Sequence, residues 1–225
     1  MHLSDKNVGI LATSAIVGAP IALAVGAALS LYLRKDKHIV VVFFGDGATD
    51  EGIFYESLNF AALKRLPVLF VCENNFYATN SSQKARQPLD NIFQRGIIFG
   101  IKGFRCDGNN ARKVSELSER CIKNIRKGGG PFLMECRTYR WKGHVGPDCD
   151  VVSGCRPGYE VETWQKKCPI RLLEKYLIGK KILSEKEVKD IRGVLSAEID
   201  QAEKLGKEGP YPPHTDLLSG VYYKD

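Results

Sequence analysis

Residues 40–79 read VVVFFGDGATDEGIFYESLNFAALKRLPVLFVCENNFYAT, and this stretch decides the fold. The uninterrupted apolar run at residues 39–44 predicts a buried strand, because it is short and rich in β-branched side chains. A helical pattern follows and ends at Pro67, and residues 68–72 predict a second buried strand. A strand, a helix and a strand in this order form a right-handed crossover between parallel strands. The stretch therefore predicts an α/β fold.

Polar clusters end both predicted strands, with Gly45-Asp46-Gly47 after the first and Glu73-Asn74-Asn75 after the second. The carboxyl ends of parallel strands share one edge of a sheet, where α/β proteins bind ligands. Glycines let backbone amides approach a ligand, and the amino end of the following helix favours an anion such as a phosphate. Asp46 and Asn75 offer the hard oxygen ligands that Mg²⁺ prefers. We therefore predict a metal-bound diphosphate, and the alternative is a tight turn and a plain loop.

The same clusters resemble the thiamine diphosphate motif, which opens with GDG and closes with NN. The segments GDGATDEG, ESLNFAAL, LPVLFVCENN and RTYRWKGHVGPD are similar to the α subunit of the E1 component of 2-oxo acid dehydrogenases. The resemblance covers residues 14–205 and implies the thiamine diphosphate-binding fold. It also implies that Asp46, Asn75 and the backbone carbonyl of Tyr77 hold Mg²⁺.

The resemblance implies roles for further residues. Gly47 and Ala48 would carry the diphosphate together with the amino end of the helix. Val17, in the segment SAIVGAPIALAVGAAL, would contact the aminopyrimidine ring of the cofactor through its backbone. Ala15, a second candidate for this contact, departs from the family pattern, because many members have a glycine there. His144 would contact the cofactor and is the predicted catalytic residue.

Two departures from the family pattern bear on activity. Val145 stands where animal pyruvate dehydrogenases carry a regulatory serine, so we expect no phosphorylation control at this position. The family's amino-terminal part, which includes a tyrosine–arginine pair for the diphosphate, has no counterpart in this sequence. Three explanations stay open: the chain is a fragment, another chain supplies that part, or the activity has been lost.

Composition limits the other function classes. The 225 residues are 44% hydrophobic, which is enough for one sizeable core. The formal net charge of +7 comes from basic residues spread along the chain, so we expect no nucleic-acid partner. The uncharged stretch at residues 8–33 is rich in Ala and Gly, and we expect a packed helix from residue 18 to 33 rather than a membrane span. The seven scattered cysteines favour a reduced, cytoplasmic protein.

The remainder of the chain predicts two more strands and several helices. Residues 101–106 and 131–136 predict strands, separated by a surface helix at residues 111–127, and residues 88–100 predict a short helical segment. Asp107-Gly108-Asn109-Asn110 predicts a turn with a helix N-cap. Residues 147–159 predict a long loop. Ser184 and Glu187 form a capping box that begins the second of two amphipathic helices, at residues 169–178 and 184–205.

Together these patterns predict an α/β fold with a mostly parallel sheet and helices on both faces. The expected organisation is a cofactor-binding domain at residues 1–165, a helical part at residues 166–209 and an extended tail at residues 210–225. The resemblance implies an E1 subunit that decarboxylates a small 2-oxo acid with thiamine diphosphate and Mg²⁺. A β-type subunit would supply the activating glutamate, so Glu51 and Glu56 are expected at the helix surface or an interface. A lipoyl acyltransferase is a further expected partner, and a non-catalytic remnant is the alternative; the sequence does not indicate which 2-oxo acid is used.

Overall fold

The computed structural model describes residues 2–219. The chain divides into two compact units, Met1–Leu173 and Glu174–Asp225, and the first contains the sheet. Its strands are β1 (Val40–Gly45), β2 (Val68–Asn74), β3 (Lys102–Asp107) and β4 (Phe132–Arg137). These lie within one or two residues of the ranges that the apolar runs predict, and β2 continues through the polar Glu73 and Asn74.

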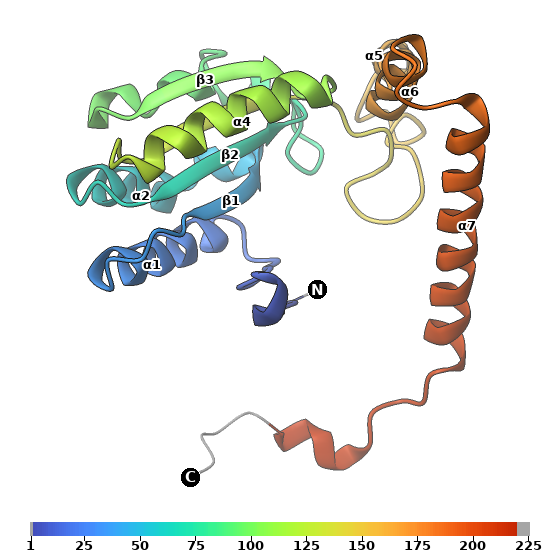
Figure 1. Cartoon of the computed structure of the whole chain (residues 1–225), viewed down its shortest axis with the longest axis horizontal. Helices are drawn as coiled ribbons and strands as arrows, with labels where there is room; N and C mark the ends of the chain where they lie inside the picture. Colours follow the sequence, from blue (N-terminus) through green and yellow to red (C-terminus); the bar gives the residue numbers. More distant parts are fainter. Residues whose placement is uncertain (1, 220–225) are drawn as a thin grey trace. The chain divides into compact units, whose positions relative to one another are not determined.

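All neighbouring strands are parallel, in the order β1-β2-β4-β3. Figure 1 labels β1, β2 and β3 of this sheet. The register pairs Gly45 of β1 with Glu73 of β2, and Asn74 of β2 with Arg137 of β4. The carboxyl ends of these three strands therefore lie level with one another. The predicted α/β fold with a parallel sheet is confirmed.

Helices cover both faces of the sheet. On one face, α1 (Ala19–Leu33) and α2 (Gly52–Leu63) pack on β1 and on alternate side chains of β2, such as Phe70. On the other, α4 (Ala111–Arg126) packs on the opposite side chains of β2, together with β4. The small side chains of α1 suit this close packing, since Ala24 and Ala28 are buried.

The strand β1 is buried on one face only, so the prediction of a fully buried strand from the apolar run at residues 39–44 was wrong. Its burial alternates along the strand, with Val40, Val42 and Phe44 in the core. Val41 and Phe43 point to the face that carries α4, and they are 38% and 61% exposed. The reason is that α4 packs on β2, β3 and β4 and leaves the edge strand uncovered.

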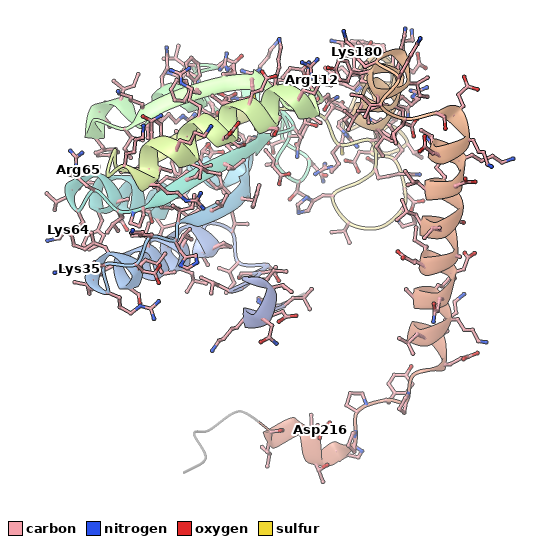
Figure 2. All side chains as sticks on the ribbon, in the orientation of Figure 1. Lys35, Lys64, Arg65, Arg112, Lys180 and Asp216 are labelled. Atoms are coloured by element: carbon pink, nitrogen blue, oxygen red, sulfur yellow. The ribbon has the colours of Figure 1, made fainter. Side chains whose placement is uncertain are left out.

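Basic residues follow the carboxyl ends of α1 and α2. Lys35 and Arg65 adopt left-handed backbone conformations with φ of 55° and 52° just beyond these helices. Figure 2 shows Lys35, Lys64 and Arg65 gathered at this end of the unit. Positive charge there complements the helix dipoles. Because α1 leads into the start of β1, and α2 runs back from the end of β1 to the start of β2, the amino ends of both helices point toward the carboxyl edge of the sheet.

The shorter elements refine the predicted pattern. Residues 88–100 contain two 3-10 turns instead of one helical segment, and the apolar Leu89 and Ile97 are exposed. Part of the expected loop at residues 147–159 begins an unpredicted helix, α5. The capping box of Ser184 and Glu187 is confirmed. The elements are η1 (Lys6–Val8), η2 (Asp46–Asp50), α3 (Gln83–Arg86), η3 (Ile92–Gln94), η4 (Ile97–Phe99), α5 (Gly158–Gln165), α6 (Pro169–Gly179), α7 (Glu185–Glu208) and η5 (His214–Leu218).

The last predicted segment, the extended tail at residues 210–225, contains the turn η5, and residues 220–225 lie outside the described part of the chain. Within residues 2–219, no helix combines the length and the apolar character needed to cross a membrane.

Candidate functional site

The strand register brings the two polar clusters together at the carboxyl edge of the sheet. Gly45 pairs with Glu73, so Asp46 and Asn75 each lie just beyond that level. The backbone amide of Asn75 faces the Asp46 carboxylate and is one of the groups that stabilise its charge. The backbone packs closely beside Asp46, because a Cβ added to Gly47 would lie 3.1 Å from the Cβ of Ala78.

Asp46 is a fully buried carboxylate with two unlike oxygens. Its Oδ2 accepts a hydrogen bond from Arg86, whereas its Oδ1 is buried without a hydrogen-bond partner. Burial raises the pKa of Asp46, and the Arg86 guanidinium opposes that shift. A buried anion with an unpaired oxygen is costly in a finished core, so this atom indicates a site for a cation.

The two asparagines have different surroundings. Asn74 is buried, and its Nδ2 donates to Glu135 Oε1 at 2.7 Å and to Gln83 Oε1 at 3.1 Å. Asn75 is half-buried, and its Oδ1 accepts from the backbone amide of Tyr77 at 3.1 Å. The first asparagine therefore anchors the loop, and the second keeps an amide oxygen at the edge of the sheet.

The backbone between Asn75 and Tyr77 is constrained. Phe76 has a φ of 69°, which is uncommon for a residue with a bulky side chain. Its amide donates to Asn74 Oδ1 at 3.0 Å, and its carbonyl accepts from Gln83 at 2.7 Å. These bonds hold the loop that carries the Asn75 side chain and the Tyr77 carbonyl.

Glu135 is the centre of this anchoring network, and the sequence analysis did not single it out. Its side chain is fully buried in β4. Oε1 accepts from Asn74 and from Arg137 Nε at 2.7 Å each. Oε2 accepts from the Phe93 amide at 3.0 Å and from Arg105 Nε at 3.1 Å. One signal was available: a lone carboxylate in the apolar run PFLMEC has to find donors.

His144 is exposed in the loop after β4, and Arg140 connects that loop to the loop after β2. Arg140 lies 3.1 Å from His144 Nδ1 through one guanidinium nitrogen and donates to the Thr79 carbonyl at 3.0 Å through the other. Thr79 follows Ala78, the residue that a Cβ added to Gly47 would meet. Buried Arg156 holds the same loop by donating to the carbonyls of Arg140 and Lys142.

Val17 lies close to the amino end of α2, because the next residue, Gly18, packs against Glu51 and Ile53 there. Gly18 has a φ of 81°, and a Cβ there would lie 2.7 Å from Ile53 Cγ2 and 3.4 Å from Glu51 Cβ. Val17 and Ala15 are exposed, and Glu51 and Glu56 are exposed on α2 and its cap. Val17 is therefore placed near the helix terminus that was predicted to face the diphosphate.

Replacing Gly18 by alanine should destabilise the chain by about 1–2 kcal/mol, because an L-residue at this φ is strained and its Cβ meets Ile53. Urea unfolding of the two proteins measures the difference. Gly26→Ala is the matched control, since Gly26 lies inside α1 with open space around it and alanine favours helix there. A Gly18→Ala protein as stable as the control would contradict the close approach.

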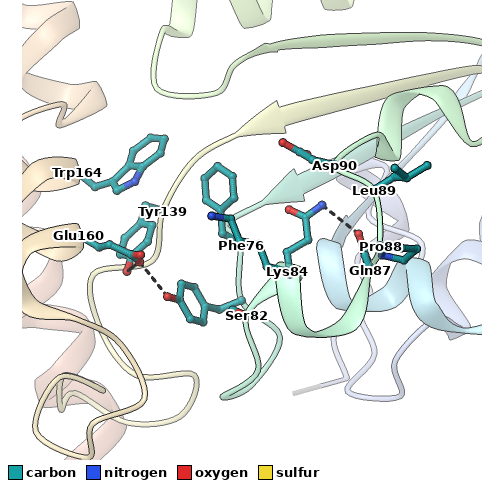
Figure 3. A pocket seen from close by; sticks show the side chains of 12 residues that line it. Phe76, Ser82, Lys84, Gln87, Pro88, Leu89, Asp90, Tyr139, Glu160 and Trp164 are labelled. Carbon is teal, nitrogen blue, oxygen red and sulfur yellow. Dashed lines mark hydrogen bonds between the residues drawn. The ribbon is translucent and has the colours of Figure 1, made fainter.

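A cavity of about 590 Å³ lies beside the Asn75–Tyr77 loop, in the same unit as the sheet (Figure 3). Its wall includes Tyr77, Tyr139, Glu160 and Trp164. Glu160 Oε2 accepts from Tyr77 at 2.9 Å and from Tyr139 at 3.0 Å, and the rings of Tyr139 and Trp164 are stacked. Burial, followed by the Glu160 contact, raises the pKa of Tyr77 to about 12. The same causes raise the pKa of Tyr139, so both tyrosines are neutral donors. Helix α5 contributes a wall of this cavity and was not predicted from the sequence.

The residues at the sheet edge fit Mg²⁺ bound together with a diphosphate. Within residues 2–219, no three His, Cys, Asp or Glu side chains gather into a metal cluster. A site built from Asp46, Asn75 and a backbone carbonyl needs no such cluster, because phosphate oxygens and water complete the octahedron of Mg²⁺. The unpaired Oδ1 of Asp46 and the close approach at Gly47 are the observations that agree with this donor set.

These features define an α/β protein whose sheet edge is suited to a metal-bound anion. Comparison with known proteins places it more closely: the chain belongs to the dehydrogenase E1 component family, whose model matches residues 1–215.

Several curated α subunits are similar to the chain. The chain is 36% identical to the α subunit of acetoin:2,6-dichlorophenolindophenol oxidoreductase from Bacillus subtilis, over 99% of this chain and 66% of that protein. It is 35% identical to the chloroplastic pyruvate dehydrogenase E1 component subunit alpha-3 of Arabidopsis thaliana, over 99% of this chain and 53% of that protein. It is 33% identical to the mitochondrial pyruvate dehydrogenase E1 α subunit of Sminthopsis macroura, over 61% of that protein. The chain thus spans between half and two thirds of the length of these relatives.

Proposed function

We propose that the chain is an α-type subunit of a thiamine diphosphate-dependent 2-oxo acid dehydrogenase, and that it uses Mg²⁺. The observation that carries the proposal is the buried Asp46 carboxylate, with one unpaired oxygen, beside the backbone amide of Asn75 at the carboxyl ends of two parallel strands. Membership of the E1 family supports the oxidoreductase class. The pairing of E1 α subunits with β subunits supports a β-type partner, and a lipoyl acyltransferase would receive the acyl group.

The residues of this chain would divide the work as follows. Asp46, Asn75 and the Tyr77 carbonyl would hold the cation. Gly47, Ala48 and the amino end of α2 would hold the diphosphate through backbone amides, where the helix dipole favours an anion.

His144 would stand beside the reacting carbonyl of a small 2-oxo acid, oriented by its contact with Arg140. The cofactor, when bound, supplies the electron sink for decarboxylation. No general base is assigned in this chain, because the activating glutamate would come from the β-type subunit. A reduced cytoplasmic location agrees with the seven free cysteines.

Calorimetric titration of thiamine diphosphate tests the proposal, with and without Mg²⁺, into the chain alone and into its mixture with a β-type E1 subunit. We expect binding that requires Mg²⁺ and is strengthened by the partner. The absence of binding in all four mixtures would contradict the proposal and favour a subunit that keeps the fold without the chemistry.

A further inference from the structure

Arg86 bridges two carboxylates at the candidate cation site, and no site motif in the sequence includes it. One guanidinium nitrogen pairs with Asp46 Oδ2 and another pairs with Asp50 Oδ2. The Arg86 side chain is 15% exposed and Asp46 is fully buried, so the pair is shielded from water. Shielding strengthens charged hydrogen bonds of this kind, and the planar guanidinium fixes their directions.

The segment around Arg86 is held in place from several sides. Arg86 ends the short helix α3, where the Ser82 side chain accepts from the Ala85 amide. Its Nε donates to the Ser81 carbonyl at 3.3 Å. The next residue, Gln87, is buried and donates to Asp50 Oδ1 at 2.7 Å and to Thr49 Oγ1 at 3.0 Å. The guanidinium therefore has a defined position relative to the Asp46 turn.

The two oxygens of Asp46 are consequently assigned to different tasks. Arg86 uses Oδ2, and Oδ1 is left buried without a partner. A carboxylate that is fixed through one oxygen presents the other in a constant direction. Ligating carboxylates in metal sites are themselves hydrogen-bonded in this way, and loss of the supporting group typically costs about 10–100-fold in metal affinity.

The net charge of the groups around Asp46 indicates whether the cation would bind alone or together with an anion. Arg95 lies 4.0 Å from Asp50, so two arginines face the two aspartates and their formal charges cancel. A divalent cation gains little from a cluster without net charge. It would bind here together with an anion such as a diphosphate.

We propose that Arg86 is a positioning residue for a divalent cation at Asp46: it clamps Oδ2 and Asp50 so that Oδ1 faces the metal. This inference rests on the proposed function. A positioning role and simple charge repulsion predict opposite changes in Mg²⁺ affinity when Arg86 is removed. If the arginine only repelled the cation, removing it would tighten Mg²⁺ binding, whereas loss of a positioning group weakens it.

The test is the apparent Mg²⁺ affinity at a fixed concentration of thiamine diphosphate, followed by calorimetry, with the β-type subunit present if the unmodified chain requires it. For Arg86→Met we expect an affinity for Mg²⁺ that is weaker by about 10–100-fold, with cofactor loading restored at excess Mg²⁺. Arg86→Lys keeps the charge, but an ammonium group cannot bridge both carboxylates as the planar guanidinium does. Its Mg²⁺ affinity should therefore lie between that of Arg86→Met and that of the unmodified chain. Lys84→Met is the matched control, because it removes an equal charge from an exposed position on the same helix.

The outcomes separate the inference from the proposed function. Unchanged or tighter Mg²⁺ binding by Arg86→Met overturns the positioning role while the unmodified chain still binds. No Mg²⁺-dependent binding by the unmodified chain with its partner rejects the proposed function, and this inference is rejected with it. Should Arg86→Met fail to fold, Asp50→Asn removes the other anchor of the clamp, and an unchanged Mg²⁺ affinity in that variant rejects the inference.

Discussion

Asp46→Ala is expected to abolish Mg²⁺-dependent binding of thiamine diphosphate, with an affinity at least about 100-fold below that of the unmodified chain. Asp46 is the only charged group among the three predicted ligands of the cation, and the neighbouring Asp50 is already engaged by Arg86 and Gln87. Calorimetry with cofactor and Mg²⁺ measures the loss.

Folding should survive this substitution. Burial without full pairing raises the pKa of Asp46, so the carboxylate is not a favourable part of the metal-free core. Arg86 also keeps Asp50 as a partner. Circular dichroism and thermal unfolding therefore check that lost binding reflects the site.

The control for Asp46 lies at the same edge of the sheet. Asp107 ends β3, and its Oδ1 accepts from the Asn109 amide at 3.0 Å, as the predicted turn requires. Asp107→Ala should leave cofactor affinity within about threefold of the unmodified chain, since rim carboxylates that only hold a turn contribute little to a distant ligand. Full cofactor binding by Asp46→Ala would remove the metal assignment altogether.

Glu135→Ala is expected to lower the free energy of unfolding by about 3–5 kcal/mol, the usual cost of removing one partner from a buried charge network. Four donors converge on the two carboxylate oxygens of this side chain, from Asn74, Phe93, Arg105 and Arg137. Even Glu135→Gln should be strongly destabilising, because one amide oxygen replaces two acceptors and its NH₂ group faces donors. Urea unfolding monitored by circular dichroism measures both changes.

Glu73→Gln is the control for this experiment. Glu73 lies in the same sheet one residue before Asn74, but its side chain is exposed. A change within about 0.5 kcal/mol is expected, as for most surface substitutions. If Glu135→Ala unfolds with the same midpoint as Glu73→Gln, then the buried network does not hold the Asn75–Tyr77 loop and the account of that loop is wrong.

The sheet could be predicted from sequence because each strand is a short apolar run that stops at polar or glycine residues. The same rule placed Asp46 and Asn75 at one edge, since parallel strands fix which ends meet. It failed for α5, which is only eight residues long and lacks a side-chain N-cap. It also failed for residues 88–100, where the apolar spacing fits a helix but the backbone forms two separate 3-10 turns.

The supporting residues of the site could not be predicted in this way. Arg86 lies 40 positions from Asp46, and Glu135 lies 61 positions from Asn74. Neither contact leaves a local pattern in the sequence, because a salt bridge or hydrogen bond between segments so far apart in the chain depends on the order and register of the strands. A lone buried glutamate indicates that hydrogen-bond donors must lie nearby, but the fold determines which residues provide them.

The uncovered side of β1 bears on how the protein behaves as its concentration is raised. Val41 and Phe43 stand exposed on an edge strand that contains no proline and no charge, within the run IVVVFF at residues 39–44. Such a strand is a template for pairing with further copies and for amyloid-like stacking. The chain purified by itself should therefore associate with further copies as its concentration is raised, which light scattering measures. Covering this strand with another chain should suppress that association.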